Sequence, residues 1–246
     1  MPLFESFNLG HGFRKYFTVE LAHDTASLDT VFRIRHEVFS DDLGLAPHRP
    51  DRRLSDAFDD ASLHCLIRDS APPHEAIGCA RLILAERLAA DTLLPFESAT
   101  RSISEPVLPD RRRVGEISML AIRASHRRRH GEALAPISLQ SEDFATREQP
   151  RFPFIPIGLF LGILSLAADV GLETLVMLSS PRLASHLVRL GIRMHEPDGA
   201  HADGTDKIPV IIDVAPNLAE MPLLLQPIWE SVRQDIRRTP LAPPSI

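Results

Sequence analysis

Cysteine is scarce in this 246-residue chain, and this scarcity excludes two classes of protein. The two cysteines, Cys65 and Cys79, are too few for a disulfide-stapled secreted domain, and their spacing does not match a cysteine-based zinc site. They fall in two strand-like runs that would pair as a hairpin, so they would come close together. We expect reduced, buried thiols rather than a redox pair.

An excess of positive charge is also missing, because the formal net charge is −6 at pH 7. A nucleic-acid partner is therefore not indicated. The first residues lack the basic and apolar regions of a secretory signal peptide, and no internal repeat is present. The length suits a single domain with appendages, and the cytoplasm is the expected location.

No apolar run is long enough to cross a membrane. The most apolar stretch covers residues 152–171, where Pro156 has the place of a first helical residue and Gly171 that of the residue after the helix. The helix between them would hold about 15 residues and measure about 22 Å, less than the ~30 Å apolar core of a bilayer. A buried core helix is the favoured interpretation.

Proline, by contrast, is abundant, and its clusters mark loops between regular elements. The pattern between these loops predicts a helix (26–40), a hairpin (62–69 and 76–85), a strand (114–122), the apolar helix, a strand (172–180), a helix (181–192) and two final strands (192–197 and 207–216). A hairpin followed by β-α-β units indicates an α/β (α+β) class with a mixed sheet and helices on both faces.

Charged residues interrupt the apolar pattern at three places. Glu116 lies in the apolar strand 114–122, where an ionised carboxylate is costly unless it is paired or chemically used. It is the candidate general base, and the alternative is a structural ion pair with Arg81. Arg81 lies in the apolar strand 76–85 and requires a carboxylate partner, from Glu116, from Asp59 or from a substrate. Arg35, near the apolar side of helix 26–40, has the same alternatives.

Four motifs occur in a fixed order: RIRHEVF (33–39), DAFDDASLH (56–64), IGCARLIL (77–84) and GEISMLAI (115–122). With them the chain resembles the acyl-homoserine-lactone autoinducer synthases, the long-chain N-acyl amino acid synthases and, more closely, the acyltransferases associated with the PEP-CTERM/exosortase system. The resemblance covers roughly residues 7–215. It implies a GNAT acyltransferase fold and transfer of an acyl group from acyl carrier protein or acyl-coenzyme A to an amine, such as that of an amino acid.

The resemblance also implies an acceptor site. Arg35 would pair with Asp56 or Asp59, which match the DxxD of the following loop, and this network would shape the acceptor pocket. Phe39 and His64 fall in the same motifs and are assigned to the acceptor site, with a plain core position as the alternative for each.

The fourth motif carries the predicted catalytic group, in which Glu116 and Ser118 join Arg81 of the neighbouring strand. It also departs from the relatives, because Met119 replaces an arginine that helps to form their acceptor site. A carboxylate-bearing acceptor would then be held by Arg35 or Arg81 instead, or would not be the acceptor.

The acyl donor is predicted to lie along strand 114–122. The run 128–133 formally fits R-x-x-G-x-[GA], which binds the pyrophosphate of coenzyme A in GNAT enzymes, but no helix begins there. We therefore favour acyl carrier protein, whose phosphopantetheine arm has one phosphate. The predicted contacts to the arm are Ile117, Met119, Leu120 and Arg128, and the arginines at 111–113 and 127–129 would form a basic rim. Solvated loop charges are the alternative for these arginines.

The predicted organisation is a GNAT-like acyltransferase domain over 1–216, followed by a peripheral helix and a proline-rich tail over 217–246. We expect no metal site and no bound cofactor, because the acyl-phosphopantetheine thioester is a substrate. The apolar helix and the strand 172–180 would line a tunnel for the acyl chain. The alternative functions are a homoserine-lactone-type synthase that uses S-adenosylmethionine, and a non-catalytic module that binds acyl carrier protein.

Overall fold

The protein is built around a mixed β-sheet. A computed structural model describes residues 3–100, 108, 110–127, 153–197 and 206–239. Within them the sheet has the strand order β1-β2-β3-β4-β5-β6. The strands are β1 Phe17–Ala22, β2 Ser62–Asp69, β3 Ala76–Leu84, β4 Val114–Ile122, β5 Thr174–Ser179 and β6 Ile208–Asp213. All neighbours are antiparallel except β4 and β5, which run parallel.

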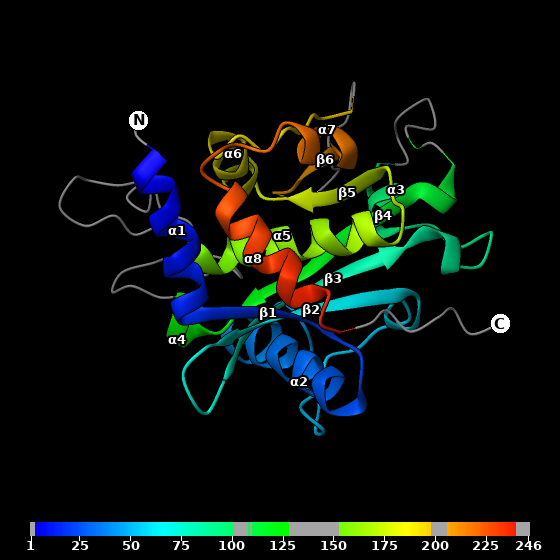
Figure 1. The fold of residues 1–246 in the computed structure, drawn as a ribbon. Helices are drawn as coiled ribbons and strands as arrows, with labels where there is room; N and C mark the ends of the chain where they lie inside the picture. Colours follow the sequence, from blue (N-terminus) through cyan, green and yellow to red (C-terminus); the bar gives the residue numbers. More distant parts are fainter. Residues whose placement is uncertain (1–2, 101–107, 109, 128–152, 198–205, 240–246) are drawn as a thin grey trace.

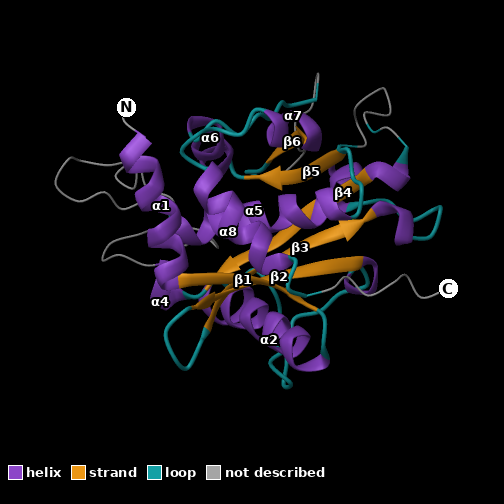
Figure 2. Ribbon diagram, viewed as in Figure 1, coloured by secondary structure: helices purple, strands orange, loops and turns teal. Residues whose placement is uncertain are grey.

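Helices cover both faces of this sheet, as Figures 1 and 2 show. The helices are α1 Leu3–Tyr16, α2 Thr25–Arg35, α3 Pro95–Ala99, α4 Ala124–Arg127, α5 Phe154–Asp169, α6 Pro181–Arg189, α7 Val214–Ala219 and α8 Gln226–Ile236. Helix α2 packs on one face, whereas α5 packs on the opposite face with α8 laid over it. The predicted mixed sheet with helices on both faces is confirmed.

The predicted helix over 26–40 divides into two parts. Asp24 caps the start of α2 through a capping box, in which its side chain accepts from the Ser27 amide. Helix α2 ends at Arg35, and the chain continues as a π-helical segment over His36–Asp42. Such wider turns are rare and occur frequently at functional sites.

The hairpin and the strand at 114–122 agree with the prediction. Strands β2 and β3 pair antiparallel, with Cys65 opposite Ala80 and Leu66 opposite Cys79. The two thiols are therefore one register position apart and on opposite faces of the sheet, and both are free and buried. Burial raises the pKa of both thiols, that of Cys79 to about 11, so they stay protonated and inert at neutral pH.

Helix α5 is the centre of the main core. A helix that is apolar all round needs cover on every side, and α5 has the sheet beneath it and α8 above it. Gly171 follows the helix with φ of +75°, as predicted, but Pro156 is the third helical residue rather than the first, because the helix begins at Phe154. No helix in the described part of the chain is long and apolar enough to span a membrane.

Three features differ from the prediction or were missed. The N-terminal pair α1 and β1 was not predicted, although β1 forms one edge of the sheet. The run 192–197 is not a strand, since it contributes a single bridge, from His195 to Ile211. Helix α8, predicted to be peripheral, buries its apolar side chains in the main core. The domain boundary after residue 216 itself stays a prediction.

Candidate active site

The sheet opens between its two parallel strands. The pairing of β4 with β5 covers only Val114–Ile117 against Thr174–Met177. Beyond Ile117 the two strands diverge, as Figure 1 shows, so the rest of β4 has β3 on one side and, among the described residues, no strand on the other. Backbone N–H and C=O groups along such an edge need hydrogen-bond partners. The edge can accept an extended, amide-bearing molecule as a further strand.

A bulge in β4 is the local cause of this divergence. Arg81 pairs with Ser118 and Cys79 pairs with Ala121, so that Met119 and Leu120 together face one residue of β3. Met119 has φ of +49°, a left-handed conformation that is uncommon for a residue with a side chain. An extra residue bends its strand and increases its twist. The bulge therefore turns the end of β4 away from β5.

The predicted contacts to the acyl donor are placed differently by this geometry. Met119 and Leu120 are half-buried residues of the unpaired edge. Ile117 is the last paired residue, and its side chain is buried in the core beside α5. Arg128 and the motif over 128–133 lie outside the described residues. The role of these residues in binding the donor stays a prediction.

Next to this opening lies a buried network of two arginines and two aspartates. Arg35, at the end of α2, donates from Nη1 to Oδ1 of Asp59 at 2.7 Å. Arg81, on β3, donates from Nη1 to the same oxygen at 2.9 Å and to Oδ1 of Asp56 at 2.5 Å. The Asp56 amide in turn donates to Oδ2 of Asp59 at 2.8 Å. Asp59 therefore ties the π-helical side of the site to the sheet.

Electrostatics favour the charged form of Asp59. Burial raises the pKa of this carboxyl, but Arg35, the Asp56 amide and Arg81 together outweigh burial and hold the pKa below its ordinary value. The arginines have side chains that are 0% and 2% exposed, so each needs a carboxylate in contact. The expected network is thus present, with one difference: Asp56 pairs with Arg81 and not with Arg35.

His64 lies against this network as a neutral ring. Its Nδ1 lies 2.9 Å from Nη2 of Arg35, which carries only donors, so Nδ1 acts as the acceptor. Burial and then the charge of Arg35 lower the pKa of His64 to about 4. The ring also meets Phe32 edge-on, with the centroids 5.9 Å apart. These contacts are those of a satisfied core histidine that orients Arg35.

Ser118 connects the network to the opening. Its Oγ accepts from Nε of Arg81 at 2.9 Å, and Ser118 is the first residue of β4 beyond the part that pairs with β5. Arg81 thus contacts three side chains with its planar guanidinium group. Its Nη1 donates to Asp56 and Asp59, and its Nε donates to Ser118. Phe39, also assigned to the acceptor site, packs half-buried against the small core beneath α2.

Glu116 is buried but does not pair with Arg81. Its Oε2 accepts from the backbone N–H of Phe96, the second residue of α3, at 2.9 Å. Burial raises the pKa of Glu116 to about 7, although this hydrogen bond and the charge of Arg81 lower it. The alternative of a direct Glu116–Arg81 pair is therefore wrong. A carboxyl with a pKa near neutrality can exchange protons in the physiological range.

The arginines predicted to form a basic rim are engaged in ion pairs. Arg111 pairs with Glu97, Arg112 with Asp110 and Arg113 with Glu173. These three precede β4, at the end where β4 and β5 are still paired, and not at the opening. Arg127 is buried and pairs with Asp42 at 3.0 Å. The exposed Arg112 and Arg113 agree with the alternative of solvated loop charges, the buried Arg127 fits neither interpretation, and the basic rim stays a prediction.

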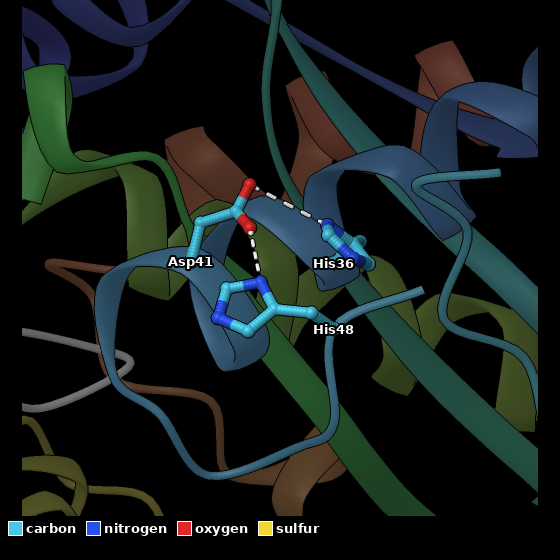
Figure 3. A group of neighbouring side chains, drawn as sticks. All are labelled: His36, Asp41 and His48. Atoms are coloured by element: carbon cyan, nitrogen blue, oxygen red, sulfur yellow. Dashed lines mark hydrogen bonds and ion pairs between the residues drawn. The ribbon is translucent and has the colours of Figure 1, made fainter. Parts of the chain in front are cut away.

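A group of metal-type side chains occurs near the π-helical segment, and Figure 3 shows it. The carboxylate of Asp41 lies between Nδ1 of His36, at 3.4 Å, and Nδ1 of His48, at 3.1 Å. Nε2 of His36 accepts from the Arg49 amide at 3.0 Å, so the proton of the neutral ring is on Nδ1. A metal ion needs the lone pair of that nitrogen, and Arg52 already occupies Asp41. The group fits a carboxylate with several proton donors better than a metal site.

The chain is similar to known proteins in part of its sequence and in its fold. Residues 34–136 match the family described as acetyltransferase (GNAT) domain. The matched segment includes strands β2, β3 and β4. The network around Arg81 and strand β4 lie within the matched residues. Strand β5, on the other side of the opening, lies outside them. No curated protein sequence matches the chain.

Solved structures share the fold of the chain. TofI, in a ternary complex with an inhibitor and MTA, matches with a TM-score of 0.57 at 18% identity, over 89% of this chain and 98% of TofI. The AHL synthase LasI matches with 0.56 at 14% identity, over 89% and 97%. FeeM, an N-acyl amino acid synthase from uncultured soil microbes, matches with 0.50 at 15% identity, over 85% and 97%. The predicted GNAT fold is confirmed.

The sequence indicated the charged residues but not two features around them, one hydrogen-bond partner and one β-bulge. Nothing in the pattern indicated that the Phe96 amide would receive Glu116, because α3 is short and lies in a loop-rich stretch. The bulge at Met119 was also missed, since a left-handed methionine has no sequence signature. A signal was available for Asp56 and Asp59. They are three residues apart, in the loop between the helix of Arg35 and the hairpin.

Proposed function

We propose that this chain is an N-acyltransferase that moves a fatty acyl group from a phosphopantetheine thioester to the amine of an amino acid or a similar small acceptor. The observation that carries the proposal is the unpaired edge of β4 beyond Ile117, which lies directly beside the buried network at Ser118. The phosphopantetheine arm contains amide groups, so it can bind to this edge as a strand does. The GNAT match and the shared architecture support the same reaction class.

The reaction would be a direct attack within a ternary complex. The acceptor nitrogen attacks the thioester carbonyl carbon, the C–S bond breaks, the thiol leaves, and the amine loses one proton. Backbone N–H groups of the unpaired edge are suited to stabilise the carbonyl oxygen as negative charge develops on it. This step needs neither a metal nor an enzyme-bound acyl intermediate, in keeping with the inert thiols of Cys65 and Cys79.

We assign the proton to Glu116, because its pKa of about 7 suits a general base at neutral pH. The side chain is only 2% exposed, so the proton would reach it through a bridging group such as water rather than by direct contact. Arg81 and Ser118 would position the edge of β4, and the network of Arg35, Asp56, Asp59 and His64 would shape the acceptor pocket.

The first prediction concerns this base. Glu116→Gln keeps the acceptor for the Phe96 amide but removes the titrating carboxyl, so we expect amide formation to slow by about 10²-fold or more. In the parent protein kcat/KM should rise with pH through about 7, and this rise should disappear in the variant. Thiol release and amide product are measured together, by a thiol reagent and by mass spectrometry. Unchanged turnover in the variant rules out Glu116 as the base.

Acyl carrier protein is the acyl donor we propose, and the association with the PEP-CTERM/exosortase system belongs to the same proposal. Both rest on the sequence motifs. The test offers acyl carrier protein and coenzyme A thioesters of the same acyl chain to the purified protein. A kcat/KM at least tenfold higher for the carrier-protein thioester supports the proposal, and the reverse preference contradicts it.

A homoserine-lactone synthase is the second candidate, because TofI and LasI share the architecture over nearly their whole length. Supplying S-adenosylmethionine as the acceptor decides between the two. Formation of an acyl lactone supports the second candidate, whereas a simple amide formed with other amines supports the first. Binding of the thioester without turnover indicates a non-catalytic module.

A further inference from the structure

The structure narrows the class of acceptor, on the basis of the proposed N-acyltransferase function. A carboxylate on the acceptor is bound most strongly by a cation, and the described network beside the opening contains Arg35 and Arg81. Their surroundings show whether either cation is available. The third position to consider is Met119, which lies on the unpaired edge and carries no charge.

Arg35 is committed to the protein itself. Its Nη1 donates to Asp59 and its Nη2 donates to His64, and its side chain is fully buried. To bind a substrate carboxylate, Arg35 would have to break its contact with Asp59. The buried Asp59 would then keep Arg81 as its remaining arginine partner. Losing one partner of a buried charge pair is strongly unfavourable. Arg35 is therefore a structural cation.

Arg81 is neutralised in the same way, by two carboxylates at once. Its Nη1 contacts Asp56 at 2.5 Å and Asp59 at 2.9 Å, while its Nε is used by Ser118. The two arginines of the network are already balanced by Asp56 and Asp59, so a third carboxylate at Arg81 would approach both aspartates without a cation of its own. Like charges at such distances repel, and the repulsion is strong away from water.

Asp56 is the accessible charged member of the network. Its side chain is 35% exposed, whereas that of Asp59 is 7% exposed. Both hydrogen bonds that Asp56 accepts from described side chains and amides, from Arg81 and from Phe58, go to Oδ1, so Oδ2 receives none from the described residues. Through Arg81 this carboxylate is linked to Ser118 at the start of the opening. The accessible charged group of the described network is therefore a carboxylate.

We infer that the acceptor is an amine without a carboxylate and with a second cationic group, and that Asp56 binds this second group through Oδ2. A short diamine has this chemistry. One ammonium group is held at Asp56, while the other nitrogen loses its proton and attacks the thioester carbonyl carbon, with release of the thiol. An amino acid has the same amine but brings a carboxylate for which the described network has no free cation.

The experiment compares matched acceptors with the intact protein and one acyl thioester. Lysine and 1,5-diaminopentane differ only by the carboxylate, and 1,5-diaminopentane and pentylamine differ only by the second amine. We expect kcat/KM for the diamine to exceed that for each of the other two by at least tenfold. Equal or faster acylation of lysine overturns the inference and leaves the N-acyltransferase function intact. Failure to acylate any amine overturns the proposed function and the inference with it.

A pair of variants tests the role of Asp56. Asp56→Asn keeps a side chain that can accept from Arg81 and Phe58 but removes the charge. We expect the preference for 1,5-diaminopentane over pentylamine to fall by at least fivefold, mainly through KM for the diamine. Asp60→Asn removes an exposed charge nearby and should retain the preference of the parent protein. An unchanged preference in Asp56→Asn overturns the inference, and the comparison of acceptors with the parent protein stands even if that variant is unstable.

Discussion

Arg35 and Arg81 illustrate what a buried charge requires of its neighbours. Each arginine enters an otherwise apolar element, the inner side of α2 or the central strand β3, and both converge on one oxygen of Asp59. A guanidinium group does not lose its proton in proteins. The unfavourable free energy of burying its charge therefore has to be offset by carboxylate or other hydrogen-bonding partners. The sequence places these partners on the loop between α2 and β2.

His64 responds to the same charges in the opposite way, by staying neutral. Its pKa is about 4 in the folded protein and about 6.5 in the unfolded chain, so the unfolded chain binds more protons between these two values. The stability that neutral His64 contributes is fully present above pH 6.5. It is lost as the pH falls from 6.5 towards 4.

We therefore predict that His64→Gln reduces the loss of stability in acid. Glutamine can accept a hydrogen bond from Arg35 but cannot become charged. The variant should therefore keep up to roughly 3 kcal/mol of the free energy of unfolding that the parent protein loses across this range. The measurement is the free energy of unfolding by urea at pH 4 to 7. His23→Gln, at an exposed histidine, is the control and should follow the parent protein. Parallel pH profiles for His64→Gln and the parent protein contradict the prediction.

Two glycines allow helix α5 to pack closely against its neighbours. Gly158 and Gly162 are four residues apart, so both lie on one face of α5. A methyl group at Gly162 would lie 2.5 Å from Sγ of Cys65, and one at Gly158 would lie 2.7 Å from the ring of Phe13. The helix therefore approaches β2 and α1 more closely than any larger residue permits.

We predict that Gly162→Ala destabilises the protein, although alanine favours a helix. Overpacking costs about 1–3 kcal/mol, more than the ~1 kcal/mol that alanine gains over glycine in a helix interior. Gly12→Ala on α1 is the matched control, because its added methyl group would lie at 3.4 Å from Phe154, an ordinary contact. Denaturant unfolding measures both. A variant at Gly162 that is as stable as that at Gly12 would disprove the close-packing argument.

The predicted acyl tunnel also belongs to this element. Leu159 and Leu164 are fully buried in the core between α5 and the sheet. Strand β5 lies along the same core and supplies Leu175 and Met177. These apolar residues have the chemistry that an acyl chain requires, and the tunnel itself stays a prediction.

At the scale of the whole molecule, the divergence of β4 from β5 divides the sheet into two wings. One wing comprises β1 to β4, with the arginine–aspartate network on its α2 side, and the other comprises β5 and β6. The wings stay joined at Val114–Ile117, so the opening widens from that join towards α4. A molecule bound in the opening contacts the central edge of the sheet and the network at Ser118 at the same time.

This arrangement predicts a localised change in hydrogen exchange. The probe is a thioether analogue of an acyl donor, which cannot react. It should slow the exchange of those β4 amides beyond Ile117 that point away from β3, because they gain hydrogen bonds. We expect this exchange to slow by about tenfold or more. The amides of Val114–Ile117, already paired on both sides, are the internal control. Protection elsewhere without protection at 118–122 places the donor at another site.

The sequence by itself determined the fold class and most of the charged site. Periodicity and proline placement located β2 to β5, α5 and α6, because these elements carry strong local patterns. The cost of burying charge singled out Glu116, Arg81 and Arg35, and the motif resemblance added Asp56 and Asp59. Elements with weaker patterns were missed, namely α1, β1 and the packing of α8, since their burial depends on surfaces that form only when the chain folds.

Only the tertiary structure decided which charges pair and what remains free. It joined Asp56 to Arg81, gave Glu116 a backbone partner in α3, and left Asp56 Oδ2 without a described donor. It also bent β4 at Met119, which opened the sheet beside Ser118. The physical reason is that pairing depends on distances between residues remote in sequence, whereas the need for a partner is a property of each residue in its own element.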